Sequence, residues 1–246
     1  GCLNTGTFDE TGTSKYGSEI APGLLAVHHQ HFFNFRLDTM LDGVKNSVVE
    51  TETYEEPEGP NNPHSNAFYP VSRTFKTEKE AVRILDLQTQ RTWKIVNKNS
   101  KNFVNQPVGY KIMPGENCLP YAHDSASLIK RAGFLKNHLY VTQYDRDELY
   151  ATGKYPNQHK GGEGLTKYIE NDRPIDDEDI VVWYTMGHHH ITRPEDWPVM
   201  PTAYINFNLK PVGFFDRNPA IDVPRSNKVG ACSVSNTQST SGCSHK

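Results

Sequence analysis

The 246-residue sequence contains only four cysteines, and none of them is spaced for a thiolate metal site. Cys2, Cys118, Cys232 and Cys243 form no Cys-x-x-Cys pair, so a zinc site built from thiolates is not expected. Cys232 and Cys243 lie in a polar segment near the C-terminus. A disulfide between these two residues and a pair of free thiols are both compatible with the sequence.

Three further absences narrow the possible functions. The apolar runs are too short to cross a bilayer, so no membrane partner is predicted. The formal net charge is −3 and no basic stripe is present, so no nucleic-acid partner is predicted. No Asn-x-Ser/Thr sequon occurs, which removes one sign of secretion. The C-terminal Ser-His-Lys only partly matches the peroxisomal Ser-Lys-Leu, and the compartment stays open between cytoplasm and peroxisome.

The chain is rich in strand patterns and poor in helical ones. Short helices are expected only at 126–132 and 165–170, and the segment 224–246 reads as a polar tail after one domain that covers 1–223. Many short strands with few helices predict an all-β fold, a large antiparallel β-sandwich. Strands are expected at 23–38, 46–54, 67–77, 82–88, 92–97, 108–113, 138–144, 179–187 and 202–209.

Two of these strands form a predicted hairpin that projects from the domain. The segments 46–54 and 67–77 are separated by a stretch rich in Pro, Gly and Asn, which is typical of a wide hairpin loop. Both strands are fairly polar. We therefore expect the hairpin to reach a partner surface rather than to lie in the core.

Histidine is the most informative residue type, because six of the eleven histidines fall in two short stretches that read as strand. Side chains alternate between the faces of a strand, so His29 and His31 lie on the same face of their strand. His188 and His190 likewise share a face of their own strand. A rigid pair of imidazoles with a third from a neighbouring strand suits a divalent transition metal with an open position. Either His190 or His188 can supply the third imidazole, and the spacing does not choose between zinc and copper.

Two acidic residues point to a second cation. Asp38 follows His31 by seven residues, and Asp179 precedes His190 by eleven. If the two strands pair, these carboxylates approach one another, and with backbone carbonyls they suit a hard ion such as calcium. Ordinary solvated carboxylates are the alternative.

Several long motifs resemble those of the copper amine oxidases, most closely the microbial and fungal members. The resemblance covers roughly residues 1–223. It is carried by the segments 26–33 (AVHHQHFF), 179–187 (DIVVWYTMG), 193–201 (RPEDWPVMP) and 209–219 (LKPVGFFDRNP).

The resemblance implies a fold and a set of metal ligands. It implies the β-sandwich of the amine oxidase catalytic domain, in part, with His29, His31 and His190 as the ligands of a Cu(II) ion. It implies that Met200 lies close to this copper. It also implies a peripheral site for calcium or another hard cation, whose ligands are the side chains of Asp38 and Asp179 and the carbonyls of Thr39 and Ile180.

The resemblance further implies a reaction and a cofactor. Enzymes of this family oxidise primary amines with water and dioxygen to aldehyde, ammonia and hydrogen peroxide, using topaquinone made from the Tyr of an Asn-Tyr-Asp/Glu motif. Here none of the twelve tyrosines follows an asparagine. We expect this chain to be the C-terminal part of the catalytic domain, without the precursor Tyr or the catalytic Asp, and inactive alone.

Two partners follow from this interpretation, and one alternative stands beside it. The complete enzyme is expected to take a primary amine and dioxygen, and to form a homodimer through the 46–77 hairpin. Alternatively, the chain is a structural copper- or zinc-binding β module without redox turnover.

Overall fold

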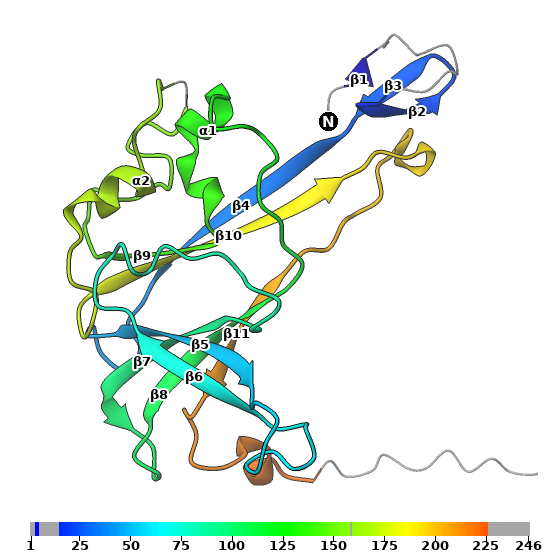
Figure 1. Ribbon diagram of the computed structural model, residues 1–246. Coiled ribbons are helices and arrows are strands. Elements are labelled where there is room, and N and C mark those ends of the chain that lie inside the picture. The colour runs from blue at the N-terminus through cyan, green and yellow to red at the C-terminus, as the bar shows by residue number, and fades with distance from the viewer. Residues whose placement is uncertain (1–2, 5–14, 158, 226–246) are drawn as a thin grey trace, which may run out of the picture.

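The structure is a computed structural model that describes residues 3–4, 15–157 and 159–225. Antiparallel strands dominate it, which confirms the predicted all-β class (Figure 1). The strands are β1 (Leu3–Asn4), β2 (Gly17–Ala21), β3 (Leu24–Val27), β4 (His29–Asp38), β5 (Ser47–Glu55), β6 (Phe68–Thr74), β7 (Thr92–Lys101), β8 (Pro107–Pro114), β9 (Leu139–Gln143), β10 (Ile180–His190) and β11 (Phe207–Val212).

Helical structure is confined to short pieces. Among the described residues, no helix has the length and apolar character needed to cross a bilayer. The α-helices are α1 (Ser127–Arg131) and α2 (Leu165–Tyr168), and the 3-10 turns are η1 (Gly133–Lys136), η2 (Ile169–Asn171), η3 (Pro194–Asp196) and η4 (Pro219–Asp222).

The strands form three sheets, and two of them build the main body. The five-stranded sheet has the order β11-β8-β7-β5-β6, and a three-stranded sheet has the order β4-β10-β9. The third sheet, β1-β3-β2, is small and lies at the far end of β4 and β10, away from the body (Figure 1). The long strands β4 and β10 therefore connect the packed body to a distal end.

The main core fills the space between the two larger sheets. Trp93 and Ile112 from the five-stranded sheet pack with Val182 and Tyr184 of β10, and all four side chains are buried. These residues take alternate positions on their strands, as expected for one buried face. This arrangement is a sandwich of the kind that the strand pattern predicts.

A second core lies on the opposite face of β10. Val181 and Trp183 point away from the sandwich and pack under the short helices with Phe134 and Leu165. Because both faces of β10 are covered, its residues form a nearly continuous apolar run instead of an alternating one.

Three of the predicted strands differ from those in the structure. The segment 23–38 is divided at His28 into β3 and β4, which belong to different sheets. The segment 82–88 forms turns, and its pairing is limited to an isolated bridge between Arg83 and Leu139. The last strand begins at Phe207 rather than at 202, because 201–206 form no ladder.

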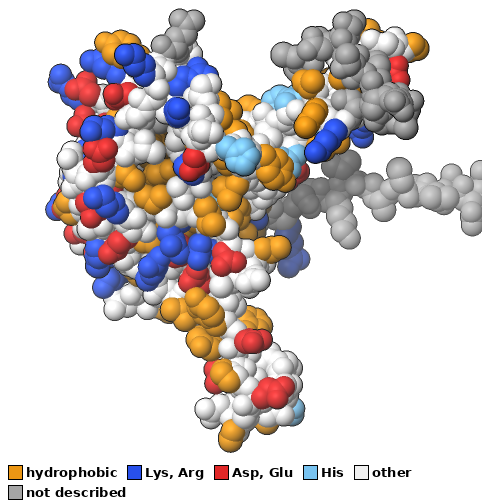
Figure 2. Space-filling view, turned by 45° about the horizontal axis from the view of Figure 1, so that its top comes forward, with side chains coloured by type: hydrophobic (Ala, Val, Ile, Leu, Met, Phe, Trp, Pro, Cys, Tyr) orange, Lys and Arg blue, Asp and Glu red, His pale blue; other side chains and the backbone are white. Residues whose placement is uncertain are grey.

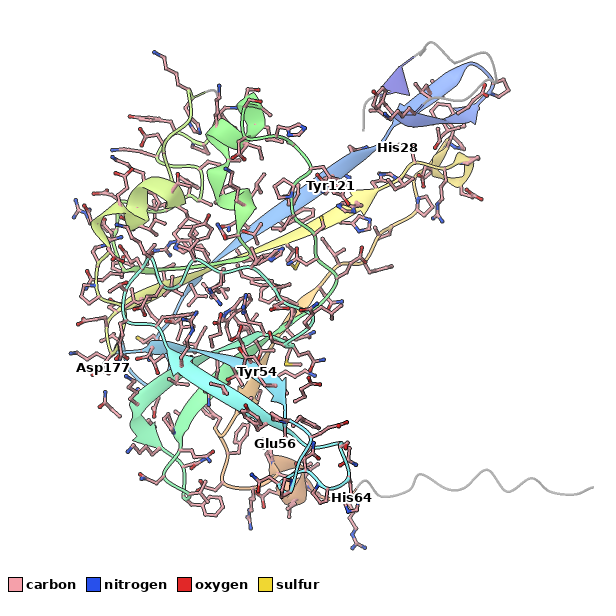
Figure 3. The ribbon with its side chains drawn as sticks, in the orientation of Figure 1. His28, Tyr54, Glu56, His64, Tyr121 and Asp177 are labelled. Atoms are coloured by element: carbon pink, nitrogen blue, oxygen red, sulfur yellow. The ribbon has the colours of Figure 1, made fainter. Side chains whose placement is uncertain are left out.

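Strands β5 and β6 pair in an antiparallel ladder from Val49 to Glu55, and the loop between them extends away from the body (Figure 1). The projecting part carries acidic and apolar side chains (Figure 2), and residues 54–72 include no Lys or Arg. His64 lies at the outer end of this loop, beyond Tyr54 and Glu56 (Figure 3). We call residues 54–72 the arm.

A buried carboxylate secures the base of the arm. Glu50 is 1% exposed and accepts hydrogen bonds from Arg73 Nε, Arg83 Nε and Trp93 Nε1 at 3.1, 2.8 and 2.9 Å. A buried carboxylate is tolerated only when charged donors surround it in this way. The base of the arm is therefore tied to β7 through Trp93 and to the segment between β6 and β7 through Arg83.

A second carboxylate joins the segment before β10 to the five-stranded sheet. Burial alone would raise the pKa of Asp176, but hydrogen bonds from Lys76, Lys98 and Ser47 outweigh burial and lower it to about 2. A lowered pKa means that the folded chain stabilises the ionised carboxylate more than the unfolded chain does.

We predict that this carboxylate makes the chain sensitive to acid. An unfolded Asp titrates near 3.9, so the stabilisation is complete above pH 4 and is lost as the pH falls toward about 2. Urea unfolding across this range should show a loss of up to about 2 kcal/mol that is absent from Asp176→Asn. The exposed Asp124→Asn is the control, and an unchanged pH slope in Asp176→Asn would contradict the prediction.

Candidate metal centre

The pairing of β4 with β10 brings the two histidine stretches side by side. The register sets His190 opposite His29 and His188 opposite His31. Residues that lie directly across an antiparallel pair point to the same face, so all four imidazoles share one face of the sheet. The sequence predicted the faces within each strand, and the ladder adds the relation between the strands.

Three of these imidazoles converge on one point. One ring nitrogen from each of His29, His31 and His190 lies within 4.8 Å of the other two, and in the described part of the chain this is the one such group of three or more His, Cys, Asp or Glu residues. The ring centroids of His29 and His190 are 4.7 Å apart, and those of His31 and His190 are 6.1 Å apart. The three predicted ligands therefore meet.

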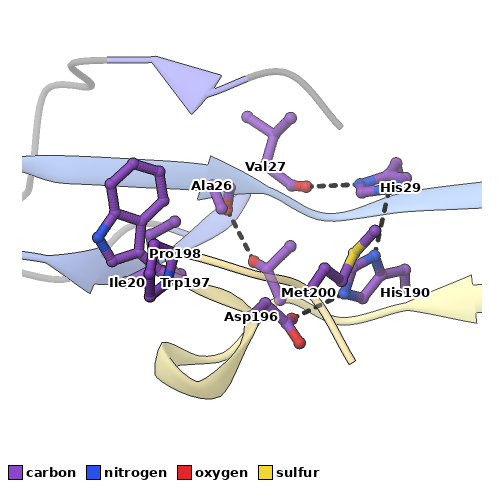
Figure 4. A pocket seen from close by; sticks show the side chains of 10 residues that line it. Ile20, Ala26, Val27, His29, His190, Asp196, Trp197, Pro198 and Met200 are labelled. Carbon is purple, nitrogen blue, oxygen red and sulfur yellow. Dashed lines mark hydrogen bonds and ion pairs between the residues drawn. The ribbon is translucent and has the colours of Figure 1, made fainter. Parts of the chain in front are cut away.

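Hydrogen bonds at the outer nitrogens define which atoms face the centre. His29 Nδ1–H donates to the carbonyl of Val27 at 2.9 Å, which leaves the lone pair on its Nε2. His190 Nε2–H donates to Asp196 Oδ2 at 2.7 Å, which leaves the lone pair on its Nδ1 (Figure 4). The two rings thus turn unprotonated nitrogens toward each other.

The separation of these nitrogens fits a shared metal ion. His29 Nε2 and His190 Nδ1 are 3.3 Å apart, and with both protons placed elsewhere no hydrogen bond joins them. Two imidazoles bound to one ion at about 2.0–2.1 Å have nitrogens about 2.8–3.4 Å apart at N–metal–N angles between 90° and the tetrahedral value. The donor set suits copper or zinc and disfavours a hard cation.

The environment also favours the neutral form of His31. Burial, followed by the neighbouring His29 and His190, lowers the pKa of His31. The hydrogen bond from His190, foremost among several, lowers the pKa of Asp196, so this carboxylate stays ionised as the acceptor. A metal binds only the neutral imidazole, so the lowered pKa of His31 favours binding, while the ionised Asp196 keeps its role as the acceptor for His190 Nε2–H.

Sequence reasoning gave no role to Asp196, although it lies within a motif that drew attention. Its carboxylate is 7% exposed and also accepts from the backbone N–H of Arg193 at 3.1 Å. The turn η3 places it beside the third imidazole. Carboxylates in this position orient metal-binding histidines in many sites. The sequence signal for this role is an Asp six residues after the histidine, in a turn that begins with a Pro.

Two hollows adjoin the cluster. One hollow of about 170 Å³ is lined by His29, His190 and Met200 together with Trp197 (Figure 4). A second, of about 390 Å³, lies against His31 and also reaches Met200. Met200 thus lies beside the cluster, as the resemblance implies, and small molecules have room to approach the three imidazoles.

The remaining histidines of the two stretches serve other contacts. His28 Nδ1 lies 3.2 Å from the Thr192 hydroxyl, between β3 and β4. His189 points to the opposite face, where its ring stacks on Tyr121 with centroids 4.7 Å apart. His188 shares the face of the cluster but bonds to Glu116.

The four residues predicted for a peripheral cation lie at the other end of the same two strands. The distance along β4 from His29 to Asp38 is about 30 Å for nine steps of about 3.3 Å. Burial, and then the charge of Asp38, raises the pKa of Asp179, so the two carboxylates are close enough to interact. The Thr39 hydroxyl donates to the Ile180 carbonyl at 3.1 Å.

Two other predictions concern residues that lie outside the described part of the chain. Cys232 and Cys243 are among these residues, so the choice between a disulfide and two free thiols stays open, and the polar tail beyond residue 225 stays a prediction. Cys118 is a free thiol, and burial raises its pKa.

Comparison with known proteins gives a consistent set of similarities. The family model for the copper amine oxidase enzyme domain matches residues 1–230. The chain is 48% identical over 217 residues to histamine oxidase of Arthrobacter globiformis, which covers 88% of this chain and 32% of that protein. It is also 48% identical to copper methylamine oxidase of Arthrobacter sp. (strain P1), with 87% and 33% covered. The chain spans about a third of the length of the curated relatives it matches.

Solved structures agree. The copper-containing benzylamine oxidase from Hansenula polymorpha superposes with a TM-score of 0.82 at 34% identity, covering 89% of this chain and 34% of that one. The similarity therefore extends across nearly all of the described fold.

Proposed function

Because the chain belongs to the copper amine oxidase family, we propose that it supplies the copper-binding part of a primary-amine oxidase. The complete enzyme would convert a primary amine, dioxygen and water into aldehyde, ammonia and hydrogen peroxide. The observation that carries this proposal is the convergence of three imidazoles, two of which, His29 and His190, have their outer nitrogens hydrogen-bonded. In this proposal His29, His31 and His190 hold Cu(II).

The chain's own residues would define how the metal is held. The Val27 carbonyl and Asp196 fix the tautomers of His29 and His190, so each ring offers one defined nitrogen. With three protein ligands, a bound ion would keep room for a further ligand, and the hollow beside His31 adjoins the cluster. Bound copper would supply redox chemistry and, in the family, the means to form topaquinone. A precursor Tyr in an Asn-Tyr-Asp/Glu motif would have to come from a segment other than these 246 residues.

We predict that the chain binds one Cu(II) through these three residues. His29→Ala, His31→Ala and His190→Ala should each lose stoichiometric copper after dialysis, measured by metal analysis and by the electron paramagnetic resonance spectrum. His64→Ala, on the arm, is the matched control and should retain copper. Retention of copper by all three cluster variants would contradict the assignment.

Activity is tested by complementation. Linked to an upstream family segment that carries Asn-Tyr-Asp/Glu, the copper-loaded chain should produce hydrogen peroxide that depends on a primary amine, and His190→Ala should abolish it. Copper binding without peroxide in any such combination would favour the alternative, a structural copper- or zinc-binding β module. The missing Asn-Tyr pair in this sequence is the observation that keeps this alternative in view.

The peripheral cation is a second, separate proposal. Asp38 and Asp179, with the carbonyls of Thr39 and Ile180, would bind calcium, and the charge interaction between the two carboxylates supports it. Millimolar calcium should raise the Tm of the chain and should not raise that of Asp179→Asn. An equal rise in both would contradict the site.

We further propose that the arm joins two copies in a homodimer. Its exposed Phe68 (73%) and its extension away from the body support this role. Replacing residues 57–66 with a short turn keeps Glu50 and its partners, and should weaken dimerisation in analytical ultracentrifugation. An unchanged dimer mass would count against the arm.

A further inference from the structure

Four imidazoles share one face of the β4–β10 pair, yet only three of them converge. His188 lies directly opposite His31 in the ladder, and cross-strand side chains at such positions are about 5 Å apart at Cβ. His188 nevertheless lies outside the group formed by His29, His31 and His190. Its backbone position is suitable for a fourth ligand, and its side chain is turned elsewhere.

A single carboxylate accounts for this orientation. His188 Nδ1–H donates to Glu116 Oε1 at 2.9 Å. The lone pair of the neutral ring is then on Nε2, so His188 keeps the ability to bind a metal. Its side chain is 22% exposed and lines the hollow of about 390 Å³ beside His31. The placement of the ring therefore decides whether it binds.

The main chain around Glu116 is fixed by its neighbour. The Asn117 side chain accepts from the Gly187 N–H at 2.7 Å and donates to the Thr185 carbonyl at 3.0 Å. A Cβ on Gly187 would meet Cys118 Sγ at 2.6 Å, so glycine is required for this close approach. Residues 116–118 are therefore held against the end of β10, immediately before the histidines.

We propose that Glu116 is a positioning residue that holds His188 out of the coordination sphere of the metal. Without it, the fourth imidazole would swing toward the cluster and close the open position. The inference rests on the copper site of the proposed function. It concerns residues 116 and 188, neither of which belongs to the ligand set.

The test counts imidazole nitrogens on Cu(II) bound to the chain. Pulsed electron paramagnetic resonance of the chain with one equivalent of Cu(II) should report three imidazoles. Glu116→Ala should report four, with a shifted copper hyperfine coupling. Glu116→Gln keeps an acceptor oxygen at the same position and should report three. Because Glu116 is 61% exposed, these substitutions should leave the fold unchanged, as far-ultraviolet circular dichroism will verify.

Two further variants separate ligand exchange from a change in charge. The double variant Glu116→Ala/His188→Ala should return to three imidazoles, and His188→Ala alone should match the unaltered chain. Three imidazoles in Glu116→Ala would overturn the proposal and leave the copper site intact. Four in the unaltered chain, one of them lost in His188→Ala, would overturn it as well. Failure of the unaltered chain to bind copper would instead refute the proposed function, and this inference with it.

Discussion

The register between β4 and β10 is the constraint on which the candidate metal centre depends. Because side chains alternate along a strand, a slip of one residue would turn His29 and His31 to one face and His188 and His190 to the other. The register is held far from the histidines, where Val182 and Tyr184 fill the sandwich core and Trp183 fills the second core. Apolar packing at one end of the strands thus positions imidazoles at the other.

Orientation of the rings is a separate matter, and groups outside the ladder determine it. The Val27 carbonyl, Asp196 and Glu116 each accept a hydrogen bond from one imidazole and so decide which nitrogen stays free. Two of these acceptors direct a lone pair toward the centre, and the third keeps a competent ring apart. The backbone therefore gathers four similar side chains, and hydrogen-bond acceptors give them different roles.

The sequence predicted the class of fold and the shared faces of the histidines, because both follow from a period of two along a strand. It also led to His29, His31 and His190 through the family motifs. It could not predict that 82–88 forms turns or that the strand is interrupted at His28, since both depend on tertiary contacts. The roles of Asp196 and Glu116 were beyond it as well: the first depends on the turn η3, and the second lies 72 residues from its partner.

The loop that carries Asn117 has one more effect. Strand β9 pairs with β10 only as far as Tyr184, so the last residues of β10 would otherwise leave a row of backbone groups open along that side. Asn117 takes the N–H of Gly187 and the carbonyl of Thr185, which denies these groups to an incoming strand from another molecule. Protection against intermolecular sheet growth is thereby built into the same few residues that border the metal centre.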